Sequence, residues 1–167
     1  MTITTTAESR IYVSPKAMAA LIADESDITA VLAEFAAITD WVEVNEAEDL
    51  GEFGDEASEV TFTAIKNGRV RKLKGSKDAG TIALVCGRDP LDAGQKALVK
   101  CEGTKFQYPF KIVASDAPDE TITDTEFYFL GLVMSKRNNY GTVDNVVRTT
   151  FNVAVNSALF EKEMKPV

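Results

Sequence analysis

Hydrophobic residues recur at two different spacings along the chain, and each spacing predicts its own type of element. In one segment they return every three or four residues, as on the buried face of a helix. This pattern predicts a helix over residues 27–38. Its inner face is expected to consist of Ile28, Val31, Leu32, Phe35 and Ile38.

Two shorter helices are predicted from their start signals. A serine–proline pair opens residues 14–23, and an aspartate–proline pair opens residues 89–101. Such pairs are frequent at helix N-termini, because the polar side chain caps the first turn and proline suits the first helical position. Gly94 lowers the helix propensity of the second segment. The inner face of that segment is expected to comprise Leu91, Leu98 and Cys101.

Elsewhere apolar and polar residues alternate with a period of two, which is the pattern of a half-buried strand. The segment of residues 125–135 is apolar on both faces, so it is expected to be covered on both sides. Pro109 predicts an edge strand or a bulge, because proline cannot donate to a strand ladder. The predicted strands are residues 59–64, 81–86, 106–113, 125–135 and 145–157.

These elements predict an α+β fold in which two packed antiparallel β-sheets form a sandwich or small barrel with a flanking helix. A single domain over residues 1–167 is long enough to enclose a hydrophobic core. Residues 1–10 are expected to be a mobile N-terminal arm without the features of a signal peptide. Residues 48–59 are expected to be a long polar loop, and residues 158–167 a loose C-terminal tail.

The composition argues against an enzyme. The chain has no histidine, which removes the most common general base and excludes Ser-His-Asp and Cys-His catalytic arrangements. Cys86 and Cys101 fall in apolar segments and are interpreted as core residues rather than a redox pair. The carboxylates of residues 43–59 lack the spacing of a calcium-binding loop, so no metal or cofactor site is predicted.

Charge is divided unevenly along the chain. The net charge is −8, but residues 1–60 carry 14 acidic and two basic side chains, whereas residues 61–167 carry 12 acidic and 16 basic ones. The most acidic segment, residues 40–59, holds nine carboxylates and almost directly precedes a basic stretch. That basic stretch comprises Arg69, Arg71, Lys72, Lys74 and Lys77.

Three interpretations of the basic stretch are open: a nucleic-acid site, a solvated face, or a self-association surface. A nucleic-acid site is disfavoured because the stretch has no phosphate-loop pattern, and residues 63–105 contain no aromatic side chain on which bases could stack. The net negative charge also repels phosphates. Self-association is favoured, because segments of opposite charge can bring copies of one chain together.

The segment GEFGDEASEVTFTAIKNGRVRKLKGSKDAGTIAL, residues 51–84, strongly resembles the tail tube proteins of long-tailed, non-contractile bacteriophages. Two later segments, RDPLDAGQKAL and YFLGLVMSKRNN with DNVVRTTFNVAVNS, resemble the same family. The resemblance extends from about Trp41 to Ser157. Within residues 51–84 it rests on the runs Gly51–Glu56, Gly68–Arg69, Lys72–Gly75 and Asp78–Gly80.

The resemblance implies a tail-tube fold and a structural role in the virion. Six copies would form a ring whose sheets join into one barrel around a lumen, and rings would stack head to tail into a hollow tube. The implied partners are further copies, the tape-measure protein, the tail terminator and the distal tail or baseplate proteins. DNA would pass without specific binding, assembly would take place in the host bacterial cytoplasm, and neither a cofactor nor a membrane is implied. The alternative is a head–tail connector, or a secretion-type tube or binding module of similar fold.

If the resemblance holds, the two charged segments are expected to meet across subunits. The basic stretch of one copy would then contact acidic residues of its neighbour, and the surplus negative charge would line the lumen and repel DNA. The predicted subunit-interface residues are Glu48, Asp49, Glu52, Phe53, Asp55, Glu56, Arg69, Arg71, Lys72, Lys74 and Lys77.

Overall fold

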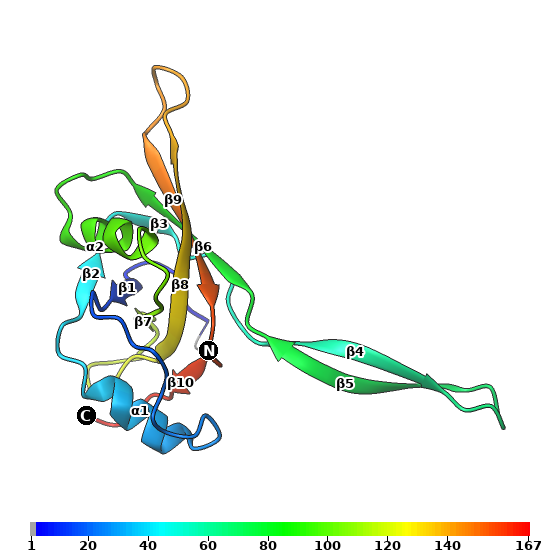
Figure 1. Cartoon of the computed structure of the whole chain (residues 1–167). Coiled ribbons are helices and arrows are strands. Elements are labelled where there is room, and N and C mark those ends of the chain that lie inside the picture. The colour runs from blue at the N-terminus through cyan, green and yellow to red at the C-terminus, as the bar shows by residue number, and fades with distance from the viewer. Residues whose placement is uncertain (1–2) are drawn as a thin grey trace.

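A computed structural model describes residues 3–167 and shows a mainly β chain with two helices. In Figure 1 a rounded body carries one long hairpin that reaches away from it. Neither helix within residues 3–167 has the length and hydrophobicity to cross a membrane. In chain order the elements are β1 (Arg10–Val13), α1 (Ile28–Ala36), β2 (Val42–Val44), β3 (Ala47–Asp49), β4 (Glu56–Thr63), β5 (Val70–Asp78), β6 (Thr81–Gly87), α2 (Ala93–Glu102), β7 (Tyr108–Val113), β8 (Glu126–Asn139), β9 (Arg148–Val155) and β10 (Phe160–Lys162).

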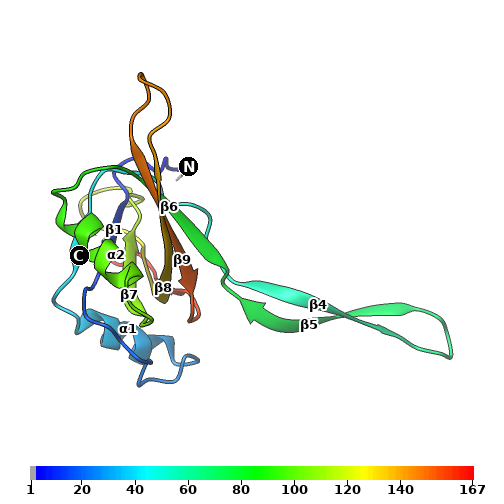
Figure 2. The same cartoon turned by 45° about the horizontal axis from the view of Figure 1, so that its top comes forward.

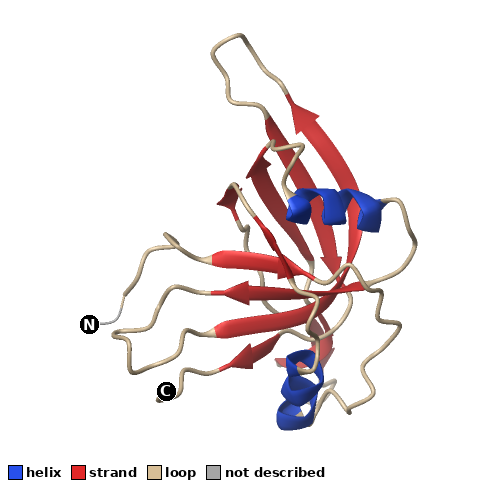
Figure 3. Ribbon diagram, turned by 90° about the vertical axis from the view of Figure 1, so that its left-hand side faces the viewer, coloured by secondary structure: helices blue, strands red, loops and turns tan. Residues whose placement is uncertain are grey.

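The body is built from one antiparallel sheet of eight strands. Its strand order is β2-β1-β7-β8-β9-β6-β3, with β10 beside β8. The strands at the two ends of this path, β2 and β3, are joined in the chain by Asn45 and Glu46 alone. The sheet therefore curls until its ends meet, and its strands fall into two groups that cross steeply in Figure 3.

Two hydrophobic clusters hold the body together, one on each face of β8. The larger cluster fills the inside of the curled sheet, where the rings of Phe110 and Phe129 stack with centroids 5.2 Å apart. On the other face α1 packs Phe35 against Tyr128 and Leu130, and the Phe35 and Tyr128 rings also stack at 5.2 Å. Each fully buried side chain of this size contributes about 1.5–3 kcal/mol. The predicted two-sided cover of residues 125–135 is confirmed as far as Leu130, whereas Leu132 is only half-buried and Met134 is 63 % exposed.

The predicted fold class is confirmed, with one refinement. The chain combines antiparallel strands in two sheets with flanking helices, as expected for an α+β tail-tube fold. The larger sheet packs against itself by curling, whereas the second sheet is the separate β4–β5 hairpin. The helix predicted over residues 27–38 is also confirmed, and the Asp27 side chain caps it by accepting from the Ala30 N–H at 3.1 Å.

The helix predicted over residues 14–23 is wrong. Ser14 does not cap a helix, because its backbone N–H donates to the Pro109 carbonyl and extends the β1–β7 ladder. Its hydroxyl donates to Asp40 Oδ1 at 2.8 Å. The backbone N–H of Met18 likewise donates to the Gln107 carbonyl, so this segment runs beside β7 as irregular chain.

The second predicted helix is present as α2, but it begins later than expected. Its N-cap is Asp92 rather than Asp89, because the Asp92 carboxylate accepts both the Gln95 N–H at 2.8 Å and the Asn45 amide at 2.7 Å. Leu91 therefore precedes the helix and is exposed, contrary to the prediction. The other two predicted inner residues, Leu98 and Cys101, are buried.

Three further expectations need correction. The C-terminal tail is not loose, because β10 pairs with β8 and Lys162 forms an ion pair with Glu126 at 2.7 Å. Of the expected N-terminal arm, residues 1–2 lie outside the described residues, and Arg10 already belongs to β1. Pro109 lies in β7, which is an interior strand and not an edge. The interior position is tolerated because Pro109 lies just beyond the last residue pair of β1 with β7, where its carbonyl accepts from the Ser14 N–H and its missing N–H interrupts no residue pair of these two strands.

The interpretation of both cysteines as core residues is confirmed. Cys86 and Cys101 are buried and form no disulfide. Burial raises the pKa of the Cys86 thiol to about 12, with a further contribution from the charge of Asp92, and burial raises the pKa of the Cys101 thiol to about 11. Neither thiol is therefore a reactive thiolate near neutral pH.

A thiol reagent should accordingly label neither cysteine in the folded protein at neutral pH. Labelling followed by mass spectrometry is expected to show modification of both thiols only after denaturant unfolds the chain. Rapid labelling of either cysteine in native buffer would contradict the buried positions.

Candidate assembly surface

The hairpin of β4 and β5 is the most unusual feature of the chain. Its two strands pair only with each other, and Figures 1 and 2 both show them reaching well beyond the body. The predicted polar loop of residues 48–59 is therefore divided between β3, a connection and the start of β4. A two-stranded hairpin alone is marginally stable in water. The side chains on its two faces therefore show which contacts beyond the hairpin could stabilise it.

One face of the hairpin is apolar and exposed. In the hairpin register Val60 lies opposite Leu73, and Phe62 lies opposite Arg71, so these four side chains share one face. The exposed fractions are 47 % for Val60, 56 % for Phe62 and 58 % for Leu73. Apolar side chains are grouped in this way on surfaces that bind another protein.

The opposite face of the hairpin carries lysine and threonine side chains. On this face Glu59 lies opposite Lys74, and Thr61 lies opposite Lys72. A bulge follows, in which Gly75 and Ser76 together lie opposite the single residue Ser58. The extra residue brings Lys77 to the same face as the other two lysines. Simple alternation along the strand would have placed it on the apolar face instead. The basic stretch predicted from the sequence is therefore split, with Arg71 on the apolar face and the lysines on the other.

The base of the hairpin is anchored to the body by Phe53. Its ring meets the ring of Phe127 edge-on, with centroids 5.3 Å apart, at the margin of the main core. Gly51 makes the turn before it with φ +71°, and a Cβ there would lie 3.0 Å from the Ala83 carbonyl oxygen. The structure therefore places Phe53, a predicted interface residue, largely within its own chain.

Two of the predicted interface charges already have partners in their own chain. Lys72 forms an ion pair with Glu59 at 2.8 Å. Glu48 accepts from both Nε and Nη2 of Arg148, the second bond measuring 2.9 Å, and this contact lowers the pKa of Glu48 and raises that of Arg148. The remaining predicted charges take part in no ion pair among residues 3–167: Asp49, Glu52, Asp55, Glu56, Arg69, Arg71, Lys74 and Lys77. Their role at an interface stays a prediction.

Two strand edges of the body lack partners over part of their length. β8 pairs with β7 as far as Gly131, and within residues 3–167 no strand pairs with Leu132–Asn139 on that side. On the far side of the same panel, β3 pairs with β6 only at Val85 and Cys86. The three strands β6, β9 and β8 therefore form a panel with a free edge on each side, which is the geometry for joining copies edge to edge.

Solved structures of two assemblies contain chains of similar fold. In a hybrid solid-state NMR and cryo-EM structure of the SPP1 tail tube, the matching chain is 15 % identical with a TM-score of 0.59, and the match covers 92 % of this chain and 76 % of that one. This chain has the tail-tube fold. A chain in a cryo-EM structure of the anti-feeding prophage baseplate is 9 % identical with a TM-score of 0.67, covering 100 % and 98 % of the two chains. No protein-family model matches the sequence, and no curated protein matches it.

Within this tail-tube fold, sequence reasoning missed the apolar face of the hairpin. Val60 and Phe62 alternate with threonines, which is also the pattern of a strand on a core. The available signal was the partner strand, because β5 offers mostly charged residues and only Leu73 could have joined them in a core. The contact of Glu48 with Arg148 was also missed, since these residues lie far apart in sequence.

Proposed function

We propose that this chain is the structural subunit of a phage tail tube, in which hexameric rings stack into a hollow conduit for DNA. The observation that carries the proposal is the projecting hairpin, whose apolar face is left exposed by residues 3–167. A second copy is the natural cover, because the tail-tube fold is found in assemblies built from many subunits. A structural role, rather than catalysis, also suits a chain without histidine.

The free edges of the β6–β9–β8 panel support ring formation. Pairing the edge of β8 in one copy with that of β6 in the next would extend the sheet from subunit to subunit. Such a contact is heterologous, and it closes into a ring when the rotation per copy is a whole fraction of a turn. The six-fold symmetrised baseplate that contains the second similar chain supports six as the number of copies.

The uncovered face of this panel is the candidate lumen wall. It presents mostly small and polar side chains, among them Thr150, Asn152 and Ala154 on β9, together with the apolar Leu132 and Val85 that pair with two of them. The strands β6 and β9 and residues 132–139 contain no acidic residue. A wall formed by this panel would be neutral to basic and polar, so it does not support the acidic lumen expected from the charge distribution. Small polar side chains still suit a conduit that DNA passes without binding.

The partners proposed for such a tube are those that the resemblance to tail tube proteins implies. Other copies, a tape-measure protein inside the lumen, a tail terminator at one end and distal tail or baseplate proteins at the other complete the proposed structure. The tube is part of the virion and would assemble in the host bacterial cytoplasm. The second candidate is a subunit of a baseplate or secretion-type tube, favoured by the likeness of the whole chain to one from the anti-feeding prophage baseplate.

Reversing the charge of the hairpin lysines tests the proposed assembly. The variant K72E/K74E should assemble only at a higher protein concentration than the wild type, because both lysines face outward on the hairpin and acidic residues of a neighbour would be repelled. Its fold should persist, since an exposed ion pair such as Lys72–Glu59 contributes at most about 1 kcal/mol. Sedimentation velocity over a concentration series measures the shift.

The matched control is K105E/K165E, which changes the charge equally at exposed sites outside the hairpin. It should assemble close to the wild-type threshold. Equal behaviour of K72E/K74E and wild type at physiological salt would remove the lysine face from the interface.

A further inference from the structure

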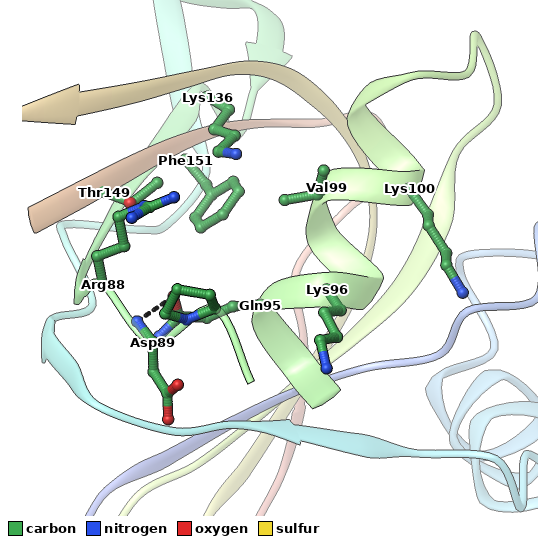
Figure 4. A pocket seen from close by; sticks show the side chains of 10 residues that line it. Arg88, Asp89, Gln95, Lys96, Val99, Lys100, Lys136, Thr149 and Phe151 are labelled. Atoms are coloured by element: carbon green, nitrogen blue, oxygen red, sulfur yellow. Dashed lines mark hydrogen bonds between the residues drawn. The ribbon is translucent and has the colours of Figure 1, made fainter. Parts of the chain in front are cut away.

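A basic cleft lies between α2 and the sheet, at a distance from the hairpin. Its volume is about 340 Å³, and Figure 4 shows side chains from α2 on one side and from β8 and β9 on the other. Val99, which is 38 % exposed, gives it an apolar lining, with the buried Phe151 at its floor. Four cations stand around this lining, and together they define the α2 cleft: Arg88, Lys96, Lys100 and Lys136.

The positive charge of the α2 cleft is not neutralised by ion pairs in the described part of the chain. None of the ion pairs found among residues 3–167 involves any of the four cations. Lys96 and Lys100 stand one helical turn apart, where like charges repel. Asp89 is the only carboxylate lining the cleft within the described residues, and its Oδ1 already accepts from the Leu91 N–H at 2.8 Å. Such a concentration of cations in a chain of net charge −8 indicates an anionic partner.

The complementary surface is the acidic loop, residues 22–27, which leads into α1. It carries Asp24, Glu25 and Asp27, all exposed, beside an Ile22 side chain that is 95 % exposed. Its backbone is fixed in place, because the Glu34 carboxylate accepts from the N–H of Ile22 at 2.9 Å and from that of the next residue at 3.1 Å. A loop ordered before binding loses less conformational entropy on docking.

The acidic loop and the α2 cleft lie at opposite ends of the body. Both Figure 1 and Figure 3 place α1 at one end and α2 at the other. The loop therefore cannot fill the cleft of its own chain, but it can reach the cleft of another copy. A contact between two different surfaces of identical chains propagates from copy to copy.

We propose that the acidic loop of one copy docks into the α2 cleft of the next. The Ile22 side chain would lie against the exposed Val99 side chain, and the flanking carboxylates would face Lys96 and Lys100. The proposal rests on the proposed self-assembling function and adds a second contact to that of the hairpin. Because the two ends differ, this contact also gives the stack of copies a direction.

Two charge-reversed variants test this pairing. K96E/K100E makes the cleft acidic, and D24K/E25K makes the loop basic. The Lys96 and Lys100 side chains are exposed and α2 buries other residues, so the first variant should fold normally. Each variant alone would set like charges against each other, and its assembly threshold in sedimentation should rise about tenfold or more. An equimolar mixture should assemble near the wild-type threshold, because each reversed surface then finds its complement on the other variant.

The loop variant needs a check on its fold, since Asp24 also accepts from the Ser26 N–H at 2.9 Å. E25K alone preserves that contact and the Asp27 cap, although it removes the Glu25 Oε2 acceptor of the Ala158 N–H at 3.3 Å. Its mixture with K96E/K100E should also assemble better than either alone. K105E/K165E again serves as the control for net charge.

Normal assembly of K96E/K100E alone would overturn the docking proposal, as would failure of the mixtures when each variant is folded. Failure of the wild type itself to assemble would instead refute the proposed tube function, and the docking proposal with it.

Discussion

The variant F62D/L73D should remain unassembled at concentrations at which the wild-type protein forms rings or tubes. Both side chains lie on the apolar face of the hairpin and are more than half exposed in the single chain. Covering them in an interface would contribute up to about 1.5–3 kcal/mol each. Covering a carboxylate without a partner is unfavourable instead, so the substitution reverses the sign of the contribution.

The same variant should leave the body of the chain intact, because the hairpin forms its own sheet. Far-ultraviolet circular dichroism and the melting temperature should therefore stay close to wild type while assembly, followed by sedimentation, is lost. The matched control K105Q/K165Q changes the net charge by the same amount at exposed sites outside the hairpin and should assemble close to the wild-type threshold. Assembly of F62D/L73D at the wild-type threshold would exclude the apolar face from the interface.

The variant G94A should be the most destabilising single substitution discussed. A Cβ at this position would lie 2.2 Å from the Glu43 carbonyl oxygen and 2.5 Å from Val44 Cα, both of them backbone atoms. β2 cannot easily retreat, because its residues are paired with β1. Alanine ordinarily stabilises a helix by about 0.5–1 kcal/mol relative to glycine, so any loss must come from this contact.

We expect G94A to lower the free energy of unfolding by about 3 kcal/mol, at the upper end of overpacking effects. Urea denaturation of the unassembled protein measures it. The control is G103A at the other end of α2, where a Cβ would meet its nearest atom at 3.6 Å and φ is −70°. That substitution should change stability by less than about 0.5 kcal/mol. Equal stability of the two variants would show that α2 can move away from β2.

Elements whose ends depend on local contacts could be predicted from the sequence. The hydrophobic face of α1 spans only a few residues, and its prediction holds for Val31, Leu32, Phe35 and Ile38, whereas Ile28 in the first turn is exposed. Distant contacts decide the elements that were mispredicted. Ser14 is held by Pro109 and Asp40, and the start of α2 depends on Asn45, none of which a local pattern reveals.

The candidate surfaces were predictable in charge but not in arrangement. The basic stretch and the acidic segment are evident in the sequence, whereas the bulge that gathers the three lysines on one face appears only in the strand register. In the sequence Phe53 belongs to a predicted polar loop. Its ring nevertheless packs at the margin of the core, because it contacts Phe127, which is distant in sequence. The α2 cleft likewise combines cations from three separate segments, so no local sequence motif predicts it.

Electron microscopy of the purified wild-type protein, negatively stained after concentration at low and at physiological salt, tests the central claim most directly. The proposed function predicts rings or hollow tubes with six-fold end views, with a salt dependence that reflects the charged surfaces. Particles of single-chain size at every concentration and salt would contradict self-assembly into a tube.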